Sequence, residues 1–231
     1  MLSLSRGRSP ASLPAATVAR LPAYVDALAD CARDGHSTVS SVHLATAAGV
    51  SPAKLRKDLS FLGSYGTRGV GYRVDVLRTT IADVLGCHRE WPVILIGCGH
   101  LGTALAHFGG FGERGFRIVG LIDADAALIG TTIAVGGRPL VVRGPEHISQ
   151  TVHQTGAEMG VIATPAAAAQ ECCDRLVAAG VSGVLSFAAV DLQVPPHISM
   201  RRIDMAAELQ ILAFHQWHRR SAPGAHSERS A

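Results

Sequence analysis

A buried strand followed by a glycine-rich turn, PVILIGCGHLG at residues 92–102, constrains the fold of this chain more than any other feature. Residues 93–96 are apolar at every position, which is typical of a parallel strand buried on both faces. Gly97, Gly99 and Gly102 follow with G-x-G-x-x-G spacing, and residues 103–108 predict a helix. We expect the first glycine to allow a tight turn, the second to let a pyrophosphate approach, and the third to let helix and strand pack closely.

An acidic residue follows at the distance that this pattern requires. Asp123 ends a second apolar run, residues 116–122, about 20 residues beyond the turn. A carboxylate there accepts hydrogen bonds from the adenine ribose and repels a 2′-phosphate, so the pattern predicts NAD(H) rather than NADP(H). Asp125 adds a second negative charge, and no arginine follows immediately to attract a phosphate. The alternative is that Asp123 only caps a turn.

Length and composition allow one large domain or two modest ones and argue against several protein classes. The chain has 231 residues and no apolar run as long as a membrane span. Its N-terminus carries Arg6 and Arg8 without the apolar core of a secretory signal. The five cysteines form no C-x-x-C pair and no zinc-binding spacing, so we expect reduced thiols, no metal and a cytoplasmic protein.

Charge is unevenly distributed along the chain. Residues 1–90 hold 11 lysines and arginines against 7 acidic residues, a net +4, whereas residues 91–231 hold 10 against 11, a net −1. Residues 51–73 are also +4, with five basic side chains opposed only by Asp58. A local basic patch of this kind predicts contact with nucleic acid.

The basic patch lies in and after a predicted helix-turn-helix. An amphipathic helix is expected first, over residues 14–33, with Pro22 either kinking it or marking its start. Ser40 and Ser51 then predict the N-caps of two short helices, and Gly49 predicts the turn between them.

The second short helix, residues 52–62, has the layout of a DNA recognition helix. At 100° per residue its leucines lie on one side and Lys57 lies almost opposite them. Cations on an outward face can contact bases and phosphates, although a solvated basic face on an ordinary helix is the alternative. The candidate DNA-binding residues of this helix and its cap are Ser51, Lys54, Arg56, Lys57 and Ser60.

A β-hairpin is expected directly after this helix. Residues 63–74 read GSYGTRGVGYRV, in which Gly66 and Gly69 bracket Thr67 and Arg68 at the predicted hairpin tip. A two-stranded ribbon in this place would be a wing, with an arginine at its tip directed at the minor groove or the backbone. Its candidate DNA-binding residues are Tyr65, Gly66, Thr67 and Arg68, and an ordinary exposed loop arginine is the alternative.

These motifs together resemble the Rex family of redox-sensing transcriptional repressors. The resemblance rests on LRKDLSFLGSYGTRGVGY at residues 55–72, followed by IGCGHLGTALAHFGGF and GLIDAD, and covers residues 14–217. It implies a winged-helix domain, a Rossmann domain, and a C-terminal helix exchanged between the subunits of a homodimer. It also implies NAD(H) as cofactor, a palindromic double-stranded DNA operator as partner, and NADH-driven release of the operator.

The resemblance adds residues to the expected cofactor site. A Thr-Pro pair near the cofactor matches Thr164 and Pro165, and a phenylalanine that reaches toward the nicotinamide matches Phe187. The chain departs from the family pattern at His100, commonly Asn, and at Ser186 and Ala189, usually Asn and Pro. The candidate cofactor-binding residues are Gly97, Cys98, Gly99, His100, Leu101, Gly102, Asp123, Thr164, Pro165 and Phe187.

The resemblance also implies a contact between domains. Arg20 and Asp204 match an ion pair that links the DNA-binding and Rossmann parts in one state of the switch. We therefore expect an α/β chain with a winged helix-turn-helix over residues 14–88, a Rossmann-type parallel sheet over 89–203 and a dimerisation helix over 204–219. Disordered tails are expected over residues 1–13 and 220–231.

Two other functions compete with a DNA-binding redox sensor. An NAD(H)-dependent oxidoreductase needs a proton donor beside the nicotinamide, yet residues 91–231 contain no lysine and no Tyr-x-x-x-Lys motif. A coenzyme-A-type nucleotide binder shares the glycine loop but does not explain Asp123 or the wing. Cys98 lies at a helix N-terminus, where the pKa of a thiol tends to fall, so a redox-active thiol competes with a small residue that simply fits.

Overall fold

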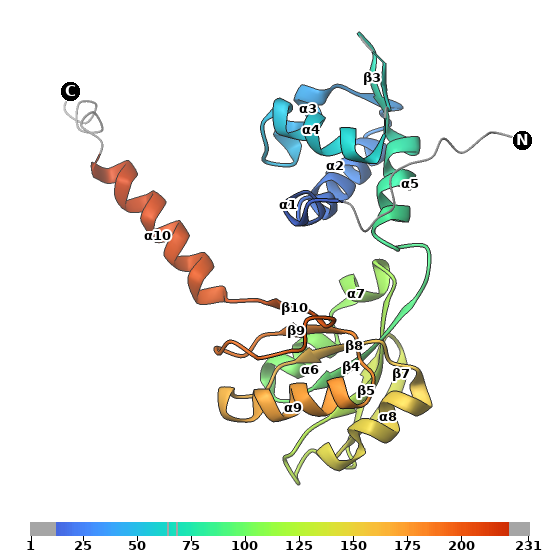
Figure 1. The fold of residues 1–231 in the computed structure, drawn as a ribbon, viewed down its shortest axis with the longest axis vertical. Helices are drawn as coiled ribbons and strands as arrows, with labels where there is room; N and C mark the ends of the chain where they lie inside the picture. Colours follow the sequence, from blue (N-terminus) through green and yellow to red (C-terminus); the bar gives the residue numbers. More distant parts are fainter. Residues whose placement is uncertain (1–12, 64, 68, 222–231) are drawn as a thin grey trace, which may run out of the picture. The chain divides into compact units, whose positions relative to one another are not determined.

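The computed structural model describes residues 13–221 except positions 64 and 68, and the chain divides into two units between Arg89 and Glu90 (Figure 1). The N-terminal unit has one hydrophobic core cluster, and the C-terminal unit has two, one on each face of its sheet.

The helices of the N-terminal unit are α1 (Ala15–Val18), α2 (Leu21–Arg33), α3 (Ser41–Ala47), α4 (Pro52–Leu62) and α5 (Val74–Val84). The single helix expected over residues 14–33 is therefore two helices. Pro22 lies in the first turn of α2, where its missing N–H costs no helical hydrogen bond. Leu21, Tyr24 and Leu28 of α2 are fully buried in the core.

The two predicted N-caps of the helix-turn-helix are confirmed. Ser40 Oγ accepts a first-turn N–H of α3 at 3.1 Å, and Ser51 Oγ accepts the N–H of Lys54 at 3.2 Å. Gly49 makes the turn between α3 and α4 with a φ of +67°, a conformation that glycine adopts without strain. The helices therefore begin and end where the local sequence predicts.

Three short strands form an antiparallel sheet in the order β1-β3-β2, in which β2 and β3 are the hairpin predicted as the wing: β1 (Thr38–Val39), β2 (Gly66–Thr67) and β3 (Gly71–Arg73). The prediction placed Thr67 and Arg68 at the hairpin tip between Gly66 and Gly69, but Thr67 pairs with Gly71 within the ladder, so the tip begins after Thr67. Gly71 is required in β3, because its φ is +97° and a Cβ would lie 2.3 Å from the Val39 carbonyl oxygen. β1 was not predicted from the sequence.

The C-terminal unit is built on a seven-stranded sheet with the order β10-β9-β8-β4-β5-β7-β6. All neighbouring strands are parallel except the edge pair β6 and β7. The chain runs from β4 outward to β7, then returns to the other side of β4, as in a Rossmann fold. The strands are β4 (Trp91–Ile96), β5 (Phe116–Ile122), β6 (Thr132–Val135), β7 (Arg138–Arg143), β8 (Met159–Ile162), β9 (Gly183–Ser186) and β10 (Ser199–Arg202).

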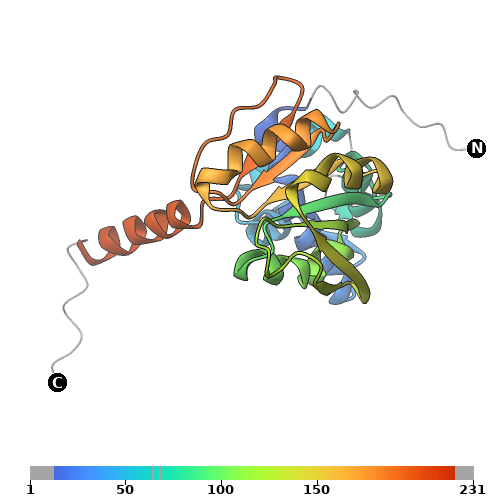
Figure 2. The same cartoon turned by 90° about the horizontal axis from the view of Figure 1, so that it is seen from below.

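Helices cover both faces of this sheet, with α8 and α9 on one face and α6 on the other (Figure 2). The glycine loop turns directly into α6, which begins three residues earlier than expected. Neither α7 nor β6 was predicted, because the first is glycine-rich and the second is a short edge strand. The helices are α6 (His100–Ala106), α7 (Gly109–Glu113), a 3-10 turn (Pro145–His147), α8 (Ile148–Thr155), α9 (Ala166–Ala178) and α10 (Met205–Ser221).

Strand β4 is buried on both faces, as its uninterrupted apolar run predicts. Ile94 and Ile96 join the core cluster that includes α8 and α9, whereas Val93 and Leu95 join the cluster on the opposite face. All four side chains are at most 4 % exposed. The glycine loop therefore starts from a rigid central strand.

Candidate functional site

The three glycines of the loop between β4 and α6 differ in the space around them: Gly97 and Gly102 leave no room for a side chain, whereas Gly99 does. A Cβ on Gly97 would lie 2.6 Å from the Ala163 carbonyl oxygen, and one on Gly102 would lie 1.7 Å from the Gly97 carbonyl oxygen. By contrast, a Cβ on Gly99 would meet nothing within 4 Å. Gly97 and Gly102 thus serve close backbone packing, whereas the space at Gly99 is available to a ligand.

Asp123 follows β5 at the carboxyl edge of the sheet and is bound to the glycine loop. Its Oδ2 accepts the Cys98 N–H at 2.5 Å, and its Oδ1 accepts the Asp125 N–H at 2.8 Å. These two hydrogen bonds fix a carboxylate beside the loop. No arginine follows Asp123 directly in the sequence, but one lies beside it in the sheet. The Asp123 N–H donates to the carbonyl oxygen of Arg143, the last residue of β7, at 2.9 Å.

The other candidate cofactor residues come from the next strands along the same edge. Thr164 and Pro165 follow β8, and Phe187 follows β9 with its N–H donating to the Ile162 carbonyl at 2.9 Å. Among the described residues, the Thr164 hydroxyl is a buried oxygen without a hydrogen-bond partner. An orphaned hydroxyl, an open loop and a fixed carboxylate together fit a phosphate- and ribose-bearing dinucleotide. His100 and Leu101 are exposed in the first turn of α6.

Cys98 is a buried thiol beside the glycine loop. Its side chain is 2 % exposed and packs in the core, with Sγ 3.6 Å from the Ile122 carbonyl oxygen. Burial, followed by the negative charge of Asp123, raises the pKa of Cys98 to about 11. Of the two interpretations left open by the sequence, the raised pKa favours a small residue that fits the core over an activated thiol.

Helix α4 presents a cationic face and buries the opposite one. Leu55, Leu59 and Leu62 are at most 7 % exposed, confirming the predicted inward side, while Lys54 and Lys57 are exposed. Those two are the only lysines in the chain. Exposed Arg56 donates to the Ser41 hydroxyl at 3.2 Å, and the hydroxyls of Ser51 and Ser60 bond to backbone groups of α4 itself.

Three of the four candidate DNA-binding residues of the wing lie in the described part of the chain. Tyr65 is half-buried and donates its hydroxyl to the Leu62 carbonyl at 3.1 Å, whereas Gly66 and Thr67 are exposed. Arg68, the expected tip residue, lies outside the described residues.

A buried carboxylate on α4 escaped the sequence reasoning. Asp58 is 2 % exposed, and Thr17, Arg20 and Tyr24 all donate to it. Arg20, expected to pair with Asp204, is thus engaged inside the N-terminal unit. Asp204 caps α10 by accepting the N–H groups of Ala206 and Ala207. The helical pattern of residues 52–62 could not reveal this contact of Asp58, because Arg20 lies 38 residues before it in the sequence.

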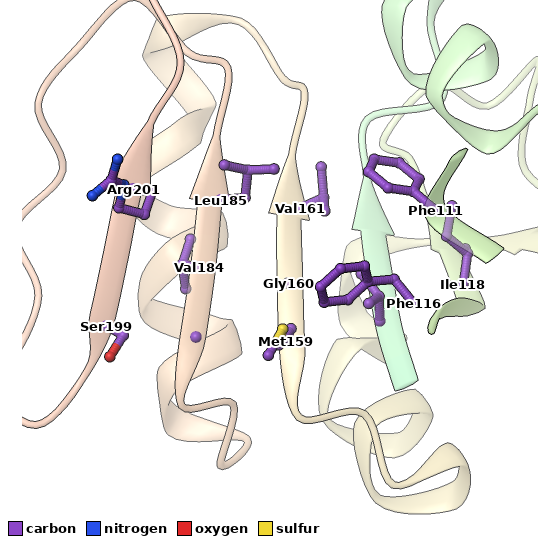
Figure 3. A pocket seen from close by; sticks show the side chains of 12 residues that line it. Phe111, Phe116, Ile118, Met159, Gly160, Val161, Val184, Leu185, Ser199 and Arg201 are labelled. Carbon is purple, nitrogen blue, oxygen red and sulfur yellow. The ribbon is translucent and has the colours of Figure 1, made fainter. Parts of the chain in front are cut away.

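One face of the sheet carries an apolar pocket of about 360 Å³ (Figure 3). Phe111, Phe116 and Val184 are among the side chains that line it, and Arg201 lies at one end. Helix α10 bears its own exposed apolar side chains, each more than half exposed: Leu209, Leu212, Phe214 and Trp217. In the described part of the chain, no helix is long and apolar enough to cross a membrane, and no group of side chains is arranged to hold a metal ion.

Known proteins resemble the two units and the whole chain. Residues 12–60 match the family described as "Putative DNA-binding protein N-terminus", and residues 88–190 match the CoA binding domain. The redox-sensing transcriptional repressor Rex of Streptomyces griseus is 52% identical over 204 residues, covering 88% of this chain and 79% of that protein. This chain belongs to the Rex family. The Rex repressor of Streptomyces coelicolor is 50% identical over 219 residues, covering 93% of this chain and 83% of that protein.

Solved structures of a Rex-family repressor share the fold. The structure of RSP with β-NAD⁺ and operator DNA has a TM-score of 0.81 at 27% identity and covers 93% of this chain and 99% of that one. The structure of RSP with β-NADH has a TM-score of 0.82 and covers 90% and 96%. The Rex chain described here is accordingly a redox-sensing transcriptional repressor rather than an oxidoreductase.

Proposed function

We propose that this Rex protein binds NAD(H) at the carboxyl edge of its sheet, binds a palindromic operator through α4 and the wing, and leaves the operator when NADH binds. The observation that carries the proposal is the presence in one chain of a cationic, capped recognition helix and a glycine loop with an acidic residue fixed beside it. An oxidoreductase does not need a cationic recognition helix, and a repressor that senses no nucleotide does not need the glycine loop with its acidic residue.

In this proposal, the backbone around Gly99 and the first turn of α6 receives the pyrophosphate, and the Asp123 carboxylate binds the adenine ribose. The Thr164 hydroxyl and Pro165 border the nicotinamide half, and Phe187 closes over it. The remaining residues of the loop, Gly97, Cys98, His100, Leu101 and Gly102, hold its shape or contact the dinucleotide through the backbone.

DNA binding is assigned to residues 14–88. Lys54, Arg56 and Lys57 supply cations for bases and phosphates, Ser51 and Ser60 border them, and the wing around Tyr65–Arg68 reaches an adjacent groove or backbone. Two such units are needed for a palindrome. We propose a homodimer in which α10 of a second copy covers the apolar pocket on the sheet, because the pocket has an apolar lining and α10 exposes apolar side chains that a pocket of this kind could bury.

The cofactor acts on DNA binding by linkage: NADH releases the operator only if it binds the released conformation of the dimer more tightly. An Arg20–Asp204 ion pair present in one conformation would bias this equilibrium, and in that conformation Asp204 would compete with or join Asp58 at the Arg20 guanidinium. Asp204→Asn keeps an N-cap side chain on α10 but removes the charge. If the pair belongs to the operator-bound conformation, this variant should weaken operator binding, and a double-mutant cycle with Arg20→Ala should be non-additive. Strictly additive losses would contradict the pair.

The test begins with selection of an operator from a randomised palindromic duplex library by the wild-type protein. Fluorescence anisotropy then follows the complex while NADH or NAD⁺ is added. We expect NADH to dissociate the complex at concentrations where NAD⁺ does not. Selection of no duplex, or equal responses to the two nucleotides, would refute the proposed function.

A further inference from the structure

Asp58 is an acidic residue in the middle of the proposed recognition helix, where an exposed carboxylate would repel DNA phosphates. The structure turns it inward, with both oxygens fully used. Its Oδ1 accepts the Thr17 hydroxyl at 2.9 Å and an Arg20 Nη2–H at 2.7 Å. Its Oδ2 accepts the Arg20 Nε–H and the Tyr24 hydroxyl, each at 2.7 Å. The donors come from α1, the N-cap of α2 and α2 itself.

Such a contact restrains α4 in a way that its leucines do not. Apolar packing of Leu55, Leu59 and Leu62 is non-directional, so it tolerates small rotations of the helix. Four hydrogen bonds to one carboxylate are directional, and charge-assisted bonds of this kind are about twice as strong as neutral ones. A rotation of about 20° would move a side-chain tip at the helix surface by roughly 2 Å, enough to break a base contact.

The neighbours of Asp58 connect this restraint to the DNA-facing side. Lys57 precedes it in sequence, and Lys54 lies one helical turn earlier. Both lysines border the same surface groove as Thr17, Arg20 and Asp58. The Arg20 guanidinium neutralises the carboxylate, so the outward charge of the helix comes from its cations alone.

We propose that Asp58 is a positioning residue for operator recognition: held by Thr17, Arg20 and Tyr24, it sets the rotation of α4 and thereby aims Lys54 and Lys57. The proposal rests on the proposed DNA-binding function. Asp58 should affect DNA binding in two separable ways. Removing its negative charge should raise the affinity for DNA of any sequence, whereas loss of the restraint on α4 should lower the affinity for the operator alone.

The experiment compares Asp58→Asn, Tyr24→Phe and wild type for binding to the selected operator and to a scrambled duplex of equal length. Asp58→Asn leaves the Arg20 cation uncompensated, so scrambled-duplex affinity should hold or rise. Operator affinity should fall, and the ratio of the two should drop about tenfold, the discrimination of one good base contact. Tyr24→Phe removes one hydrogen bond without changing charge and should lower the ratio less. Circular dichroism checks that both variants are folded.

Asp30→Asn is the matched control. It removes the same charge from an exposed pair with Arg33 on α2, so its ratio should equal that of wild type. If Asp58→Asn does not fold, Tyr24→Phe decides: a lowered ratio supports positioning and a wild-type ratio overturns it. Folded Asp58→Asn with a wild-type ratio, whatever its absolute affinities, also overturns the proposal. Wild-type protein that does not discriminate between the duplexes refutes the proposed function instead.

Discussion

Replacing Asp123 with alanine should weaken NADH binding and relax the choice between NADH and NADPH. The carboxylate is held in place by the N–H groups of Cys98 and Asp125, so its position is set before the nucleotide arrives. A hydrogen bond to a charged group contributes about 1.5–3 kcal/mol, and each 1.4 kcal/mol is tenfold in Kd. Loss of the ribose contact should therefore raise the Kd for NADH by about 10- to 150-fold.

NADPH should respond in the opposite direction. Its 2′-phosphate would meet the Asp123 carboxylate, and the variant removes that repulsion while Arg143 stays on the neighbouring strand. NADPH affinity should thus hold or rise as NADH affinity falls.

Isothermal titration calorimetry of both nucleotides measures these affinities directly. Asp125→Ala is the matched control, because it removes the same charge two residues away and loses only a bond to the Ala127 N–H. We expect its NADH affinity to change by less than that of Asp123→Ala. An Asp123→Ala protein that keeps the wild-type preference for NADH over NADPH would refute the assignment of the ribose site.

Three further outcomes are expected. Lys57→Ala should reduce the slope of log K against log salt concentration for operator binding by about one unit, and an unchanged slope by fluorescence anisotropy would mean that this lysine does not contact a phosphate. Burial alone would raise the pKa of Asp58, but its hydrogen bonds hold that pKa below the ordinary value of 3.8, so its contribution to stability is complete above about pH 4 and is lost as the pH falls through the lowered pKa. Thermal melts below pH 4 should therefore show a flatter pH dependence for Asp58→Asn than for wild type, and parallel curves would contradict this. Since the pKa of Cys98 is raised to about 11, iodoacetamide at neutral pH should label the exposed Cys87 first, and mass spectrometry showing Cys98 labelled first would contradict the buried thiol.

Much of the C-terminal unit could be predicted because its elements have strong local patterns. The apolar run before the glycine loop had to be buried on both faces, and the run at residues 116–122 is β5 to the residue. Elements with weak patterns were missed: Thr132–Val135 is a half-exposed edge strand, and α7 is built from glycine-rich sequence. Pro22 left two interpretations of the first helix open, a kink or a helix start, and the structure has a helix start, with α2 beginning at Leu21.

The site was predictable in its parts but not in its contacts. Spacing identified Asp123, yet only the folded sheet shows its carboxylate bound to the Cys98 N–H. For Cys98 the sequence left an activated thiol and a small core residue both open, and only the fold shows the burial that raises its pKa. Asp58 was counted as one negative charge against five positive ones, although its partner Arg20 removes it from that balance.

The restriction of lysine to two positions on α4 gives the protein an unusual chemical selectivity. Arginines supply every other permanently cationic side chain, and a guanidinium does not react with amine-directed reagents under mild conditions. Besides the chain's own terminal amine, acylating and reductively methylating reagents should therefore modify only Lys54 and Lys57. The isotope-labelled methyl groups on these two lysines would then report on α4, the proposed recognition helix, so NMR could follow DNA binding to this one surface in a chain of 231 residues.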